Sequence, residues 1–125
     1  MGLFDFFRKK KNLQSEMMKK MADNLFPKGE QDINAGANEL LRILENNISR
    51  DEAKNIFVKS YALCAISERF DKNRLKTHLS GYCLQYFTEK QIVEFHGYLA
   101  SLVFARVFSG KSPSQVVSEN GIIDF

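Results

Sequence analysis

The chain has 125 residues, 44% of them hydrophobic and 26% charged, which is the size and composition of one globular domain and excludes a disordered or fibrous chain. Two prolines and seven glycines are too few for many short strands joined by tight turns. The net charge of +3 is uneven: residues 1–28 carry seven basic and three acidic residues (+4), and residues 29–125 carry eleven and twelve (−1). A nearly neutral body disfavours nucleic acid as a partner, because phosphate contacts need a basic face.

Residues 1–11 form a basic, aromatic head that precedes a single helical domain over residues 12–125. Four large apolar residues followed by four cations are typical of a reversible anchor on an anionic membrane surface. Docking of the head on this or another protein, and disorder, are the two alternatives. In the head the apolar residues precede the cations, which is the reverse of the order in a secretory signal. We therefore expect the protein in the cytoplasm, or at the inner face of the membrane if the head binds lipid. The candidate membrane or partner contacts are Leu3, Phe4, Phe6, Phe7, Arg8, Lys9, Lys10 and Lys11.

A first helix is predicted over residues 12–26, because apolar residues recur there every four positions. Pro27 and Gly29 follow and end it. Its apolar face is rich in methionine, which suits either a core or an adaptable binding surface. That face comprises Leu13, Met17, Met18, Met21, Ala22 and Leu25.

Two further helices are predicted over residues 32–47 and 49–70. Asp32 is the expected N-cap of the first, and Gly36 weakens the prediction for its first turn. Ser49 and Glu52 have the spacing of a capping box at the start of the second. This second helix is apolar on more than one side, which predicts the most central position.

Three more helices follow, each with a start signal. Asp71 can cap a helix that extends to residue 87. Thr88 and Gln91 have the spacing of a capping box that opens a helix ending at 108 before Gly110, and Ser112 with Pro113 opens a short one. The short links predict antiparallel packing of neighbours. We therefore predict an all-α fold, a compact antiparallel bundle of about five helices plus a short C-terminal helix. The apolar tail that is expected to pack back on the body comprises Ile122, Ile123 and Phe125.

Two glycines stand inside the predicted helices four and five, where each costs about 1 kcal/mol relative to alanine. If the two helices fold back on each other at Thr88, then Gly81 faces Phe95 and Gly97 faces Leu79. Close packing of the two helices is the leading explanation, and room for a small ligand is the alternative. The residues of that candidate pocket are His78, Gly81, Tyr82, His96, Gly97 and Tyr98.

The sequence offers no constellation for catalysis or metal binding. Cys64, Cys83, His78 and His96 come singly from three helices, without the paired spacing of zinc ligands, and both cysteines lie in apolar runs that predict buried thiols. No Gly-rich phosphate loop or nucleophile motif occurs. We therefore predict no enzymatic activity, no cofactor and no metal.

Elimination leaves protein recognition as the leading function. We expect a cytosolic, non-enzymatic protein-binding module, such as an inhibitor, an immunity-type protein or an adaptor, that acts through a helical surface. The first alternative is a peripheral membrane protein tethered by its N-terminal segment, and the second is a ligand or enzymatic pocket between helices four and five. A homo-oligomer is compatible with the same features.

Overall fold

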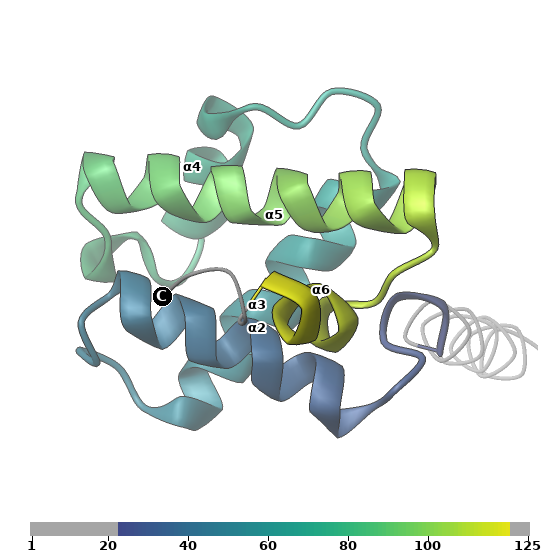
Figure 1. Cartoon of the computed structure of the whole chain (residues 1–125). Coiled ribbons are helices and arrows are strands. Elements are labelled where there is room, and N and C mark those ends of the chain that lie inside the picture. The colour runs from purple at the N-terminus through teal and green to yellow at the C-terminus, as the bar shows by residue number, and fades with distance from the viewer. Residues whose placement is uncertain (1–22, 121–125) are drawn as a thin grey trace, which may run out of the picture.

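The computed structural model describes residues 23–120, with side chains up to residue 116 (Figure 1). The head, most of the first predicted helix and the apolar tail lie outside the described residues. Within them the structure has helices and no strands, which confirms the predicted all-α bundle. The elements are α2 (Glu30–Ile43), α3 (Arg50–Ile66), α4 (Lys72–Ser80), the 3-10 helix η1 (Leu84–Tyr86), α5 (Glu89–Ser109) and α6 (Pro113–Asn120).

The predicted capping box at the start of α5 is confirmed in both directions. The Thr88 hydroxyl accepts from the Gln91 N–H at 3.2 Å, and the Gln91 side chain accepts from the Thr88 N–H at 2.9 Å. The Gln91 amide also donates to the Ile43 carbonyl at 3.0 Å. This one side chain therefore fixes the start of α5 against the end of α2. At its other end α5 stops at Gly110, as predicted, with a φ of +64°.

The box at Ser49 is half formed. Its hydroxyl accepts from the Glu52 N–H at 3.1 Å, but the Glu52 carboxylate accepts from the Tyr86 hydroxyl at 3.4 Å. Asp71 caps α4 as predicted, with its carboxylate accepting from the Arg74 N–H at 2.9 Å.

Asp32 is not the N-cap of α2, which corrects the prediction. The helix begins two residues earlier, behind Gly29, whose φ of +61° suits glycine. Asp32 is instead fully buried in the first turn, and its carboxylate accepts from the Lys28 N–H at 2.8 Å and from the Ser114 N–H and hydroxyl at 2.9 and 2.6 Å. The Ser114 N–H lies in the first turn of α6 and has no partner within that helix, so Asp32 joins α2 to α6.

The contact between α2 and α3 depends on Gly36. A Cβ atom at this position would lie 2.1 Å from the Phe57 ring, so α3 approaches the α2 backbone more closely than any side chain permits. The Phe57 ring is stacked on Tyr61 at 5.6 Å, and Phe26 packs against both rings. This aromatic group is the centre of the core.

The fourth helix is shorter than predicted. It ends at Ser80 rather than at residue 87, and a turn and η1 carry the chain to α5. Gly81, poor in helix propensity, is therefore the C-cap of α4 and not an interior residue. Because α4 ends there, the turn that follows places the Cys83 side chain in the core. The predicted contact between successive helices is present for α2 with α3 and for α4 with α5, and α4 packs on α5 more than on α3.

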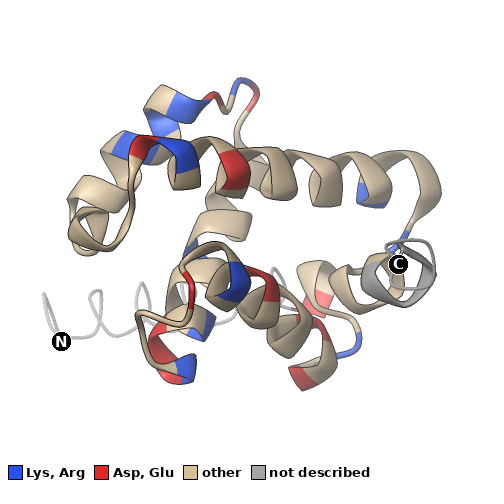
Figure 2. Ribbon diagram, turned by 60° about the vertical axis from the view of Figure 1, so that its left-hand side comes forward, with Lys and Arg blue, Asp and Glu red and all other residues tan. Residues whose placement is uncertain are grey.

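Helix α5 extends along the whole width of the molecule (Figure 1). Its inner face is core, and residues 95–105 contain no charged side chain, so the ribbon is tan between its charged ends in Figure 2. In length and composition α5 is apolar enough to cross a membrane, with a mean hydropathy of 1.2, although the sequence contains no continuous apolar run of that length. The same features describe the core helix of a globular protein. The fully or almost fully buried residues of its inner face are Ile92, Phe95, Leu99 and Leu102.

Candidate functional site

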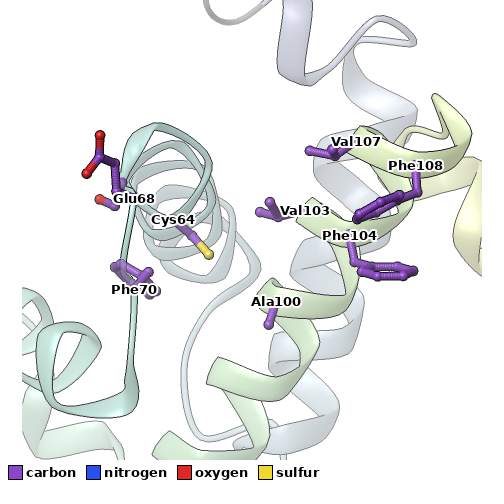
Figure 3. Close-up of a pocket in the computed structure, with 9 residues that line it drawn as sticks. Cys64, Glu68, Phe70, Ala100, Val103, Phe104, Val107 and Phe108 are labelled. Atoms are coloured by element: carbon purple, nitrogen blue, oxygen red, sulfur yellow. The ribbon is translucent and has the colours of Figure 1, made fainter.

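An open apolar groove lies between the C-terminal half of α5 and the α3 wall, by which we mean Cys64 in the last turn of α3 and residues 67–70 that follow the helix (Figure 3). We call it the α3–α5 groove; its volume is about 300 Å³. Val103 and Val107 of α5 point toward Cys64 on α3, while the Phe104 ring points away from α3 (Figure 3). The lining residues are Cys64, Ser67, Glu68, Phe70, Ala100, Val103, Phe104, Val107 and Phe108.

Large apolar side chains at the rim of the groove are exposed to solvent. Phe104 is 62% exposed, Val107 64% and Phe108 71%, and the rings of Phe104 and Phe108 lie 4.4 Å apart. Ile66, at the end of α3, is exposed to a similar degree. Single exposed apolar residues are ordinary on a protein surface, but a contiguous set beside a groove is a feature of interaction sites.

Apart from Cys64, Ser67 and Glu68, the residues that line the groove are apolar. Burial raises the pKa of the Cys64 thiol to about 11, so at neutral pH the sulfur is a protonated, weak nucleophile. Glu68 is the one charged residue of the lining.

The structure separates the residues of the pocket predicted between helices four and five. His78 and Tyr82 are in contact, with the imidazole Nε2 2.9 Å from the Tyr82 hydroxyl. The Lys59 Nζ atom lies 5.0 Å from the centre of the Tyr82 ring. His96 instead contacts the Phe70 carbonyl, at 2.7 Å from its Nε2. The pairing across Thr88 fails because α4 ends before Gly81.

Tyr98 lies in a third place, against the Phe57 ring of the core at 6.2 Å. Burial raises its pKa above the usual value for tyrosine. Its hydroxyl and that of Tyr61 are buried and have no hydrogen-bond partner among the described residues. The predicted pocket residues therefore belong to three local packing arrangements.

Neither predicted pocket glycine is explained by close packing between helices. A Cβ on Gly81 would meet only the His78 carbonyl oxygen, at 3.3 Å, and a Cβ on Gly97 would meet nothing within 4 Å. Gly97 is exposed on α5. The glycine whose missing side chain matters for packing is Gly36.

The described residues contain no group of three His, Cys, Asp or Glu side chains placed to hold a metal ion. Cys64 and Cys83 are free and buried. Burial also raises the pKa of Cys83 to about 11. The candidate contacts in the head, from Leu3 to Lys11, lie outside the part of the chain that the structure describes.

The groove was not among the predicted sites, although the sequence contained a signal for it. In the fifth predicted helix, the helical spacing places Ile92, Phe95 and Leu99 on one face. Phe104, Val107 and Phe108 do not fall on that face. Large apolar residues that do not lie on the core face of a helix are expected on its exposed side, which is where these residues lie on α5. The α3 wall carries no such signal, because it depends on how α3 and α5 cross.

No protein-family model, no curated protein and no solved structure matches this chain.

Proposed function

We propose that the protein is a non-enzymatic protein-binding module that receives an amphipathic α-helix of another protein in the α3–α5 groove. The observation that carries the proposal is the exposed apolar rim beside a groove of about 300 Å³. Burial of such a rim is the usual source of affinity at a protein interface.

A helical partner suits the walls of the groove better than an extended peptide. One wall is α5, whose backbone groups are bonded within the helix, and the other is the last turn of α3 with residues 67–70. The described residues contain no strand, so they offer no strand edge for β-augmentation. Apolar side chains at positions i, i+3 or i+4 and i+7 of a partner helix suit a long apolar groove of this kind.

Site-specific photocrosslinking tests this proposal. A benzophenone amino acid replaces Val107 at the rim, and a matched variant carries it at Asn38, which is exposed on α2. We expect cross-linking of one protein from source cells at position 107 and none at position 38, with the adduct on an amphipathic helical segment. A second variant, Ser67→Arg, adds a long charged side chain to the α3 wall and should abolish the adduct without unfolding the protein.

Adducts formed equally at both positions, or adducts that persist with Ser67→Arg, contradict binding in the groove. Adducts with lipid alone would favour the alternative of a peripheral membrane protein. That alternative rests on residues 1–11, and it predicts that a chain beginning at Asn12 keeps its helical circular-dichroism spectrum but no longer floats with anionic vesicles.

A further inference from the structure

The side of α5 that faces away from the core carries a second apolar surface. We call it the outer stripe; its exposed residues recur every three or four positions, so they lie along one face of the helix. Large side chains stand at both ends and small ones in the middle. The outer stripe comprises Val93, Gly97, Ala100, Ser101, Phe104 and Phe108.

Gly97 is unexplained by the fold of one chain. It stands in the interior of a 21-residue helix, where glycine costs about 1 kcal/mol relative to alanine, and it has neither a positive φ nor a neighbour within 4 Å of a Cβ. Three residues further on, Ala100 is also small and exposed. Small residues on an exposed helix face allow the backbone of a second helix to come close.

The order of large and small residues is self-complementary. If two copies of α5 pack antiparallel about a two-fold axis between residues 100 and 101, facing positions have numbers that sum to 201. Phe104 of each chain then faces Gly97 of the other, and Val93 faces Phe108. A ring from each chain fills the space that the other chain leaves open, which is the isologous arrangement of a two-fold dimer.

We propose that the outer stripe of α5 is a homodimer interface, with a second copy of this chain packed antiparallel across it. The apolar area exposed along the stripe is smaller than the area that a stable dimer buries, so we expect a weak dimer. With about 200 Å² for a whole phenylalanine, Phe104 and Phe108 expose roughly 250 Å² between them. With Val93 added, this reaches the lower end of the roughly 300–600 Å² of the largest patch on a typical monomer.

A stable interface buries about 800 Å² per partner, so the polar residues beside the stripe must contribute and the dissociation constant should be micromolar. This proposal does not depend on the function proposed for the α3–α5 groove, which opens toward α3, although Ala100, Phe104 and Phe108 border both surfaces.

Sedimentation equilibrium of the full chain over a range of concentrations tests the dimer. We expect the apparent mass to rise toward twice the 14.4 kDa of one chain. Gly97→Leu should raise the dissociation constant at least tenfold. Circular dichroism should show that the helices and the melting temperature are retained, because position 97 is exposed and no described residue lies within 4 Å of a Cβ there. Asn38→Leu adds similar apolar bulk to an exposed position of α2 and should leave the dimer unchanged.

A cysteine cross-link tests the register. Ala100→Cys, next to the two-fold axis, should give a covalent dimer under mild oxidation, whereas Asn38→Cys should not; the native thiols are buried. A monomer at every concentration overturns the proposal, whether or not that monomer floats with anionic vesicles. A dimer that Gly97→Leu does not weaken, or that Ala100→Cys does not link, also overturns it.

Discussion

Replacing Gly36 with alanine should destabilise the protein, although alanine is the better helix former. On an open helix surface the change would gain about 1 kcal/mol. Here the new Cβ would lie 2.1 Å from the Phe57 ring, and that ring is fully buried against Tyr61, Phe26 and Tyr98. Overpacking of a filled core costs typically about 1–3 kcal/mol and sometimes more. The short distance places this site at the upper end, so we expect a net loss of about 2 kcal/mol in the free energy of unfolding.

Urea denaturation followed by circular dichroism measures this loss, with two controls. Gly97→Ala, where a Cβ meets nothing, should gain about 0.5–1 kcal/mol at a protein concentration low enough to keep the chain monomeric. Phe57→Leu removes the ring that clashes, so Gly36→Ala should cost less in that background, with a coupling of at least about 1 kcal/mol. A Gly36→Ala protein as stable as the original, or a cost that does not change with Phe57→Leu, would refute the close approach of α2 and α3.

Three further perturbations test the electrostatics and the backbone. Burial alone would raise the pKa of the Asp32 carboxyl, but hydrogen bonds from Ser114 and the Lys28 N–H hold it below 3.8; its contribution is thus present above that pH and lost as the pH falls through the folded pKa. Asp32→Asn should cost about 2 kcal/mol at pH 7, with a difference that shrinks in acid denaturation curves below about pH 4. Burial, and then the charge of Lys59, lower the pKa of His78 below 6.5. The contribution of neutral His78 to the free energy of unfolding is therefore complete above pH 6.5 and decreases as the pH falls below that value. NMR titration of Lys59→Met should show a higher pKa for His78. Glu45 has a φ of +55°, so Glu45→Gly should raise the free energy of unfolding by about 0.5–1 kcal/mol, and a loss in urea denaturation would contradict that strain.

Helix starts were predictable because they depend on local chemistry. Thr88 and Asp71 cap helices where the sequence predicts it, since a cap involves only the next three residues. Like Asp71, Asp32 is an aspartate near the start of a helix, yet the Ser114 hydroxyl that donates to its carboxylate is 82 residues away in the sequence. A carboxylate that could bond its own helix or another one is ambiguous in a sequence, and only the packing of α6 on α2 decides between them.

The positions of helix ends and pockets were less predictable, because they depend on what packs against each segment. The helix predicted to residue 87 ends at Ser80, since the turn after Gly81 buries Cys83. That break moves His78 away from His96, and the pocket expected between them becomes two separate contacts. The α3–α5 groove is likewise a product of the crossing of two helices that are far apart in the sequence.

The two proposed surfaces share Ala100, Phe104 and Phe108, so exposure of these side chains alone does not distinguish the surfaces. The remaining residues do. Ser67 belongs to the α3 wall and lies outside the outer stripe, whereas Gly97 belongs to the stripe and is not part of the groove lining. Ser67→Arg should therefore abolish partner cross-linking and leave the homodimer intact, while Gly97→Leu should weaken the homodimer and leave the cross-link. If either variant disrupts both, the two surfaces are one interface, and the second copy of the chain would be the occupant of the groove.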